Sequence, residues 1–253
     1  MKILVLDIET APFKSLHWKL WKEFISIDQI EEEWSILSYC AKWLGSKTIT
    51  YDDTSQQRNV RDDRRLLRKL WKLLDEADIV VAQNGKKFDI KKINARLIME
   101  GYGPYSPVKV VDTYLAARRI AGFSSNKQAW LSKYLSNAKK LDHRNFPGIE
   151  LWKECLKKNP AAWREMRKYN IQDVIGCEGI YLRLRPWIEN HPNVAPKAVA
   201  KDPDRLAACP NCGSTKLHSR GDAVTAAGII YDRYQCQGCG AWPRSRKRKK
   251  AAA

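Results

Sequence analysis

Short apolar runs alternate with segments of helical spacing along the first 190 residues, and this alternation predicts the elements of one folded domain. Apolar runs that predict strands lie at residues 3–8, 34–43, 47–52, 79–83 and 108–111. Apolar side chains at helical spacing predict helices over 60–76, 88–100 and most of 113–188. Strands that come first and helices that come later, with βα units in the middle, predict an α/β domain with a mixed sheet.

Composition divides the chain into four parts. Residues 1–190 contain every predicted strand and helix of the main domain. Residues 191–207 hold prolines and no apolar periodicity, which is typical of a linker. Four paired cysteines lie in residues 208–243, and residues 244–253 form a cationic end that we expect to be a flexible tail.

The charge of the chain adds a candidate partner. Hydrophobic residues make up 44% of the 253 residues, which is enough for a packed core and excludes a disordered chain. Lysine and arginine total 46 against 28 aspartate and glutamate, a formal net charge of +18. An excess of this size indicates a polyanion, usually nucleic acid, although a positive surface can also serve only to keep a protein dispersed.

No signal peptide or membrane span is visible in the sequence. The amino terminus begins with a short apolar run, but Asp7 and Glu9 interrupt it before a signal-peptide core would end. We therefore expect a cytoplasmic protein with no membrane partner. In a reducing compartment its seven cysteines are expected to be thiols or metal ligands.

Two short polar clusters follow predicted strands. Asp7 and Glu9 lie two residues apart at the end of the first strand, so both carboxylates face one side of the sheet and can reach one metal ion. Asn84-Gly-Lys-Lys-Phe-Asp89 follows the strand at 79–83, and its turn into a helix brings Asp89 to the carboxyl edge of the sheet, where ligands gather in α/β folds. Each cluster alone also fits a polar strand end or an acid that complements a helix dipole.

The third cluster is Tyr169-Asn-Ile-Gln-Asp173, in which a spacing of four places the phenol and the carboxylate on one helical face. Alone it fits an ordinary polar helix face. In this order and setting, the three clusters resemble the motifs DxE, Nx(2–3)(F/Y)D and YxxxD of the DnaQ-like, DEDDy-type 3′→5′ exonucleases. No histidine lies near Asp173, so the sequence resembles the tyrosine group rather than its histidine-using relatives.

Further segments resemble a phage-encoded branch of the same superfamily, whose members tend to end in a zinc ribbon. These segments include SSNKQ at 124–128, ELWKECL at 150–156 and RPWIENHPN at 185–193. The resemblance spans nearly the whole chain and implies an RNase H-like mixed sheet flanked by helices. It also implies a phage-encoded protein that acts in a bacterial host.

The resemblance implies a role for each catalytic motif residue. Four hard carboxylates suit two Mg²⁺ or Mn²⁺ ions that clamp the scissile phosphate. Asp7 would bridge both ions. Glu9 and Asp173 would complete the site of the ion that activates water, and Asp89 would hold the second ion through water. Tyr169 would orient the attacking water by its hydroxyl group.

The main hypothesis is therefore an exonuclease that acts on single-stranded DNA or DNA 3′ ends, with Asn84 and Phe88 of the second motif contacting the substrate. An exoribonuclease would use the same metal ligands. A structure-specific endonuclease or transposase-like enzyme is an alternative that the YxxxD cluster argues against. A non-catalytic nucleic-acid-binding protein is another, and the presence of all five catalytic residue types argues against it. A protein partner in replication or recombination stays open.

Four cysteines near the carboxyl terminus predict a metal site. Cys209 and Cys212 form one CxxC knuckle, and Cys236 and Cys239 form a second, 23 residues later. Each knuckle is followed by glycine, which suits a tight turn over a metal. Four thiolates are the usual ligands of a tetrahedral structural Zn²⁺, and so small a module needs the metal to fold. Disulfides or a redox dithiol are the weaker alternatives, because the chain is expected to be intracellular.

Aromatic and cationic residues are interleaved in this zinc ribbon. We expect Arg233 and Tyr234 to contact nucleic acid, with Tyr231 and Trp242 beside them as further stacking rings. The alternative, held at about equal weight, is that these rings only cover a small core.

Several residues outside the motifs are expected to be structural. For Trp18, Trp21 and Phe24, in the irregular segment 12–33, buried packing is favoured over stacking on a terminal base. Asp112 is another acid at a strand end, and we interpret it as structural. The remaining cysteines lie in apolar stretches and are predicted to be core residues: Cys40, Cys155 and Cys177.

Overall fold

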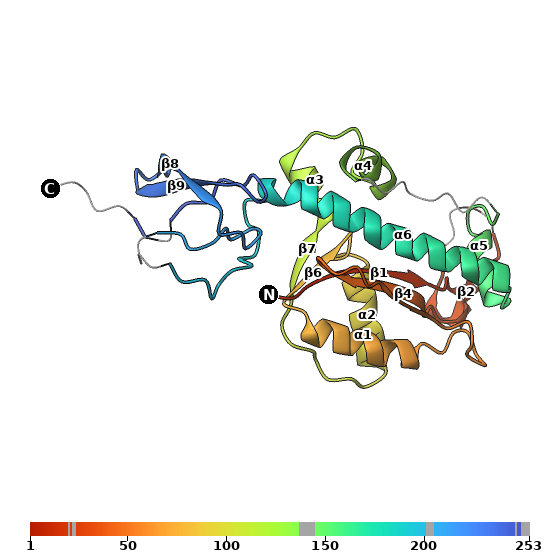
Figure 1. Ribbon diagram of the computed structural model, residues 1–253. Coiled ribbons are helices and arrows are strands. Elements are labelled where there is room, and N and C mark those ends of the chain that lie inside the picture. Colours follow the sequence, from red (N-terminus) through yellow and green to blue (C-terminus); the bar gives the residue numbers. More distant parts are fainter. Residues whose placement is uncertain (20, 22–23, 137–144, 201–204, 246, 249–253) are drawn as a thin grey trace.

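A five-stranded mixed sheet forms the centre of the main domain. The computed structural model describes all residues except 20, 22–23, 137–144, 201–204, 246 and 249–253 (Figure 1). The strand order is β5-β4-β1-β6-β7. The strands are β1 (Ile3–Thr10), β4 (Ile36–Trp43), β5 (Thr50–Asp53), β6 (Ile79–Ala82) and β7 (Lys109–Asp112). Pairs β1–β4 and β4–β5 are antiparallel, whereas β1–β6 and β6–β7 are parallel, which confirms the predicted mixed sheet.

The two faces of the sheet are covered by different helices, and β1 alternates between them. Helices α1 (Arg64–Glu76) and α2 (Asp89–Met99) cover one face, where Leu4, Leu6 and Ile8 join the leucines of α1 in the core. Helix α6 (Pro160–Leu184) crosses the other face, where Ile3 and Val5 pack against it (Figure 1). Because side chains alternate along a strand, the next residues on the α6 face are Asp7 and Glu9.

The long helical region divides into four helices. They are α3 (Thr113–Ile120), α4 (Gln128–Leu135), α5 (Glu150–Leu156) and α6. Helix α4 packs against α6, and α5 packs near its amino-terminal end (Figure 1). None of the described helices is both long and apolar enough to cross a lipid bilayer.

Helix α1 begins later than predicted. The expected start near residue 60 is wrong because Asp63, directly before the helix, is buried and turns its carboxylate inward. Its oxygens accept hydrogen bonds from the Ile36 backbone N–H at 2.9 Å and from Arg96 at 2.7 and 2.8 Å. The carboxylate therefore ties the start of α1 to β4 and α2.

Residues 12–33 contain a small separate sheet. Strands β2 (Lys14–Ser15) and β3 (Ile30–Glu32) pair in antiparallel fashion, and a short 3₁₀ helix (Ile27–Gln29) precedes β3. The sequence pattern gave no strand here because two- and three-residue strands are too short to show a period.

The cysteine module is attached at the carboxyl-terminal end of α6, after a 3₁₀ turn (Arg185–Trp187). Its hairpin consists of β8 (Leu217–Val224) and β9 (Ile230–Cys236). The Asn211 side chain donates to the Arg185 carbonyl at 3.0 Å, and the Val194 N–H donates to the Pro210 carbonyl at 2.8 Å. The segment predicted as a linker therefore contacts the module within its described part.

The predicted flexible tail needs a correction at its start. Arg244 forms a β-bridge with Arg233, and the Ser245 N–H donates to the Asp232 carbonyl at 2.8 Å. Ser245 is buried because its hydroxyl accepts the Asp232 N–H at 3.1 Å. The first two tail residues thus belong to the ribbon, and most of the remaining tail lies outside the described residues.

Candidate active site

Three carboxylates meet between β1 and α6. Oxygen atoms of Asp7, Glu9 and Asp173 all lie within 4.8 Å of one another. Two oxygens on opposite sides of an octahedral Mg²⁺ would be about 4.2 Å apart, because each Mg–O bond is about 2.1 Å. Hard oxygen donors at this spacing fit a divalent cation such as Mg²⁺ or Mn²⁺.

Asn170 holds the first of these carboxylates in place. Its side chain is fully buried on α6, and its Nδ2 donates to Asp7 Oδ2 at 2.5 Å. Its Oδ1 accepts a hydrogen bond from Ser38 Oγ of β4 at 3.1 Å. One amide therefore connects α6 with two neighbouring strands and orients a metal ligand.

Trp152 of α5 orients the second carboxylate. Its indole Nε1 donates to Glu9 Oε2 at 3.2 Å, and its ring meets Tyr169 edge-on with centroids 6.3 Å apart. Tyr169 lies one helical turn before Asp173 on α6. The predicted phenol is thus beside the carboxylate group.

Gln128 and Asn170 are two further residues of the site, and the sequence motifs did not identify either of them. Gln128 of α4 is buried, and its Nε2 donates to the Asp173 backbone carbonyl at 2.6 Å. Asn170 lies on the same helical stripe as the buried Met166 and Val174, four residues away on either side. A polar residue on an apolar stripe is a signal that could have identified Asn170.

Asp89 does not belong to the group of three among the described residues. The side chain is 2% exposed at the start of α2, and Oδ1 accepts the Ile8 N–H at 3.0 Å. Burial is the main cause that raises its pKa to about 7, and the negative charges of Asp112 and Asp173 add to the effect against two backbone N–H donors. The expectation that four acids crowd together is therefore met by three, with the fourth buried nearby.

The turn before α2 is built on Asp112. Asn84 has a positive φ of 62°, and its N–H donates to Asp112 Oδ1 at 3.1 Å. Asp112 Oδ2 accepts the Lys86 N–H at 3.1 Å, and Oδ1 also caps α3 through the Leu115 N–H. Asp112 is structural, as predicted.

The second motif places its other two residues differently. Asn84 is half-buried within the turn, and Phe88 packs in part against the core beneath α1 and α2. Substrate contact by either residue stays a prediction.

The sulfurs of the four ribbon cysteines all lie within 4.8 Å of one another. The sulfurs of Cys209 and Cys239 are 3.8 Å apart, and those of Cys212 and Cys236 are 3.6 Å apart. Four sulfurs at about 2.3 Å from one Zn²⁺ would be about 3.8 Å from each other. A disulfide requires about 2.05 Å, so the pairs are not disulfides. The donor set and its spacing fit a structural metal.

Backbone N–H groups support one of these sulfurs. The Gly238 N–H donates to Cys236 Sγ at 3.3 Å. Burial opposes ionisation of Cys236, but the N–H groups of Cys239 and Gly238 lower its pKa to about 7. The knuckle turn therefore stabilises the thiolate form of Cys236 in the absence of a metal ion.

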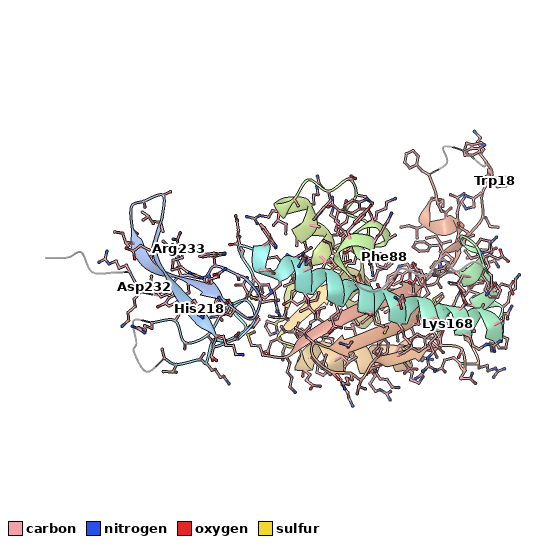
Figure 2. All side chains as sticks on the ribbon, turned by 45° about the horizontal axis from the view of Figure 1, so that its top comes forward. Trp18, Phe88, Lys168, His218, Asp232 and Arg233 are labelled. Carbon is pink, nitrogen blue, oxygen red and sulfur yellow. The ribbon has the colours of Figure 1, made fainter. Side chains whose placement is uncertain are left out.

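The ribbon aromatics differ in exposure. Tyr234 is only 7% exposed, which agrees with the alternative that its ring covers the ribbon core, whereas Trp242 is 56% exposed. Contact of Arg233 with nucleic acid stays a prediction. Arg233 lies over the Trp242 ring at 5.7 Å, and Arg244 lies over the Tyr231 ring at 4.2 Å. Arg233 is exposed on β9, at the end of the molecule away from Lys168 (Figure 2).

Comparison with known proteins gives one family and one fold. Residues 36–185 match the family model described as the RNase H superfamily. A family B DNA polymerase from the hyperthermophilic archaeon Pyrobaculum calidifontis is similar in structure, with a TM-score of 0.53 and 16% identity. The match covers 74% of this chain and 26% of that chain, so this chain spans about a quarter of the polymerase. At this identity the likeness shows a shared fold. No curated protein sequence matches.

Proposed function

The chain belongs to the RNase H superfamily, and from this premise we propose that it is a metal-dependent 3′→5′ exonuclease that hydrolyses phosphodiester bonds at DNA 3′ ends. The RNase H-like fold supports a nuclease that acts on nucleic acid with divalent metals. The observation that carries the finer proposal is the meeting of Asp7, Glu9 and Asp173 within 4.8 Å beside Tyr169. Together with the buried Asp89, these residues make up the set of the DEDDy motifs, in which the phenol replaces a histidine.

We assign the carboxylates to two cations. When bound, two Mg²⁺ or Mn²⁺ ions would supply an activated water and stabilise charge on the leaving 3′ oxygen. Asp7, oriented by Asn170, would be a ligand of both ions. Glu9 and Asp173 would complete the ligands of the water-activating ion. Asp89, buried outside the group of three, would hold the second ion through water.

Tyr169 positions the attacking water in this scheme. An ordinary phenol titrates near pH 10, so its hydroxyl group is a better hydrogen-bonding partner than a proton acceptor at neutral pH. The edge contact with Trp152 holds the ring, and the same indole holds Glu9. Water and metal ligand are thus oriented by one side chain of α5.

The proposal includes the substrate and the setting. The formal net charge of +18 supports nucleic acid as the partner, and we propose DNA, single-stranded or at 3′ ends. From the sequence resemblance alone, we further propose a phage-encoded protein that acts in the cytoplasm of a bacterial host, beside a replication or recombination partner.

The test uses single-stranded DNA and RNA oligonucleotides labelled at the 5′ end, with Mg²⁺ or Mn²⁺. We expect a descending ladder from DNA that disappears on chelation and in Asp7→Ala. Tyr169→Phe is expected to lower the rate about 100-fold or more. Tyr134→Phe, on an exposed ring of α4, is the matched control and is expected to cleave normally.

Two results would redirect the proposal. Cleavage of a closed circular substrate would indicate an endonuclease, and a ladder from RNA alone would indicate an exoribonuclease. Unchanged cleavage by both Asp7→Ala and Asp173→Ala would refute the site.

A further inference from the structure

Three aromatic side chains project from the segment between β2 and β3. Trp18 is 91% exposed, Trp21 is 83% exposed and Phe24 is 97% exposed. We name these three residues the aromatic arm. The sequence-based expectation of buried packing is therefore wrong, because among the described residues the small β2–β3 sheet leaves most of each ring exposed. Exposed apolar surface of this extent marks an interaction site.

The arm is anchored at both ends by Gln29. The Leu16 N–H donates to the Gln29 carbonyl at 2.9 Å, and the Gln29 side chain donates back to the Leu16 carbonyl at 3.0 Å. The same side chain accepts the Ser26 N–H at 2.8 Å. Two strands and a bidentate side chain thus define where the arm leaves the body and returns.

The arm lies on the side of the molecule that carries the carboxylates. Glu9 lies only nine residues before Trp18, and the intervening chain lines a groove of about 360 Å³ with Trp152. Its lining is Thr10, Pro12, Ile149 and Trp152, the residue that binds Glu9. Figure 2 shows Trp18 projecting from the end of the molecule where Lys168 marks the amino-terminal half of α6.

A second groove, lined in part by Lys14 of β2, is basic. Its volume is about 750 Å³, and its lining includes one acid, Glu32, and the cations Lys14, Arg58, Arg61, Lys153, Lys157 and Lys158. Glu32 pairs with Lys14 and Arg61, and Lys157 pairs with Glu154. The positive charge in excess therefore lies at Arg58, Lys153 and Lys158.

We propose that the aromatic arm stacks on unpaired bases of the polynucleotide whose end occupies the carboxylate site, while the basic groove holds its phosphates. The choice of occupant follows from charge and position: exposed rings next to a segment that lines a basic groove suit single-stranded nucleic acid, and the apolar groove includes Trp152, which binds Glu9. The end assigned to the carboxylate site rests on the proposed function. Each stacked base contributes about 5- to 150-fold in affinity.

Binding without hydrolysis tests the arm. With no Mg²⁺ or Mn²⁺ added and the ribbon's Zn²⁺ retained, fluorescence anisotropy measures the affinity of the full chain for fluorescein-labelled dT20 and for an abasic 20-mer with the same phosphates. We expect the wild type to bind dT20 more tightly than the abasic strand. The variant Trp18→Ser/Trp21→Ser/Phe24→Ser is expected to bind dT20 about tenfold or more weakly and to bind the two strands equally.

The controls separate stacking from folding. Trp187→Ser removes an indole that is 70% exposed at the other end of α6, and dT20 affinity is expected to stay unchanged. The triple variant is expected to keep its thermal midpoint, because its side chains are exposed. Loss of both midpoint and affinity would be resolved by Trp18→Ser alone, which is expected to lose base preference in part.

Three outcomes would overturn the proposal. One is equal dT20 affinity of wild type and triple variant. Another is a wild-type dimer, seen by light scattering, that the triple variant abolishes, which would assign the arm to a second copy of the chain. The third is binding to anionic vesicles that the triple variant loses while dT20 affinity stays the same. Absence of hydrolysis would refute only the proposed function, because this binding assay contains no added Mg²⁺ or Mn²⁺.

Discussion

At the scale of single residues, Asn170 connects the metal ligand Asp7 to the rest of the fold. Asn170→Ala removes the donor to Asp7 and the acceptor for Ser38, both in a buried setting. We expect a loss of about 1–3 kcal/mol in the free energy of unfolding and of about 10- to 100-fold in turnover. Urea unfolding and oligonucleotide hydrolysis would measure the two effects.

Asn94→Ala is the matched control for Asn170→Ala. Asn94 is also a helical asparagine with a side-chain partner, the hydroxyl of Tyr105 at 2.9 Å, but it lies on α2 away from Asp7. Some stability is expected to be lost with normal turnover. Equal turnover of the two variants would contradict the role of Asn170.

Asp89 makes the metal-free protein sensitive to pH. Burial raises its pKa from 3.8 to about 7, so ionisation is unfavourable in the folded state. The free energy of unfolding therefore falls as pH rises from about 4 to about 7 and stays low above that. Asp89→Asn keeps the acceptor for Ile8 and removes the charge. At pH 8, with no Mg²⁺ or Mn²⁺ added, we expect its thermal midpoint to exceed that of wild type by about 4 °C or more, with no gain at pH 4.

A gain of the same size at both pH values would contradict this account of Asp89.

At the residue scale, the sequence predicts which acids face one another but not how deeply each is buried. Asp7, Glu9 and Asp173 were predicted together because strand and helix periods determine which way a side chain faces. Burial of Asp89 depends on how closely α2 approaches β1, which no local period encodes.

At the scale of elements, α6 approaches α4 through glycine. A Cβ built on Gly179 would lie 2.8 Å from Ser136 Cβ and 3.2 Å from its Cα. Alanine normally stabilises a helix over glycine by about 1 kcal/mol. Here we expect Gly179→Ala to lower the free energy of unfolding by about 1–3 kcal/mol instead, because α4 must move away. Urea midpoints would show the sign.

A second substitution, at Ser136, tests whether the α4–α6 contact causes the loss of stability in Gly179→Ala. Ser136→Gly removes the atoms that the new Cβ would strike first, so Gly179→Ala/Ser136→Gly is expected to recover part of the loss. No recovery would place the cause elsewhere than the α4–α6 contact.

The elements that were predicted well have a continuous apolar run or apolar residues repeated over several helical turns. The apolar runs of β1 and β6 and the leucines of α1 were located within a few residues. The division of residues 113–188 into four helices was missed. Buried helices that are apolar on several sides have similar residue patterns, so the sequence does not mark where one helix ends and the next begins. Exposure of the aromatic arm was also missed, because the residue type alone does not show whether another part of the fold covers an aromatic side chain.

At the scale of the whole molecule, the ribbon is attached at the end of α6, and we propose that its four sulfurs hold one structural Zn²⁺. Cys236→Ser removes one of these sulfurs, so we expect loss of the bound Zn²⁺ in metal analysis and weaker oligonucleotide binding. The chemical step is expected to change less, because Asp7 and Asp173 lie elsewhere. Comparison of KM with kcat on dT20 would separate the effects.

Cys155→Ala provides the control for Cys236→Ser. Cys155 is buried in the core beside Trp163, and its loss is expected to reduce stability but not zinc content. A Cys236→Ser protein that keeps its zinc and binds dT20 normally would contradict a binding role for the ribbon.

Helix α6 spans the molecule without a break, from the neighbourhood of Trp152 to the carbonyl of Arg185 that Asn211 of the ribbon binds. Asp173 and Leu184 are eleven residues apart on it, which is about 16 Å. In the proposed exonuclease, this length of helix separates the carboxylate site from the start of the ribbon. An oligonucleotide too short to reach from one to the other would be degraded as if the ribbon were absent, so cleavage efficiency should rise in one step as substrate length passes that span.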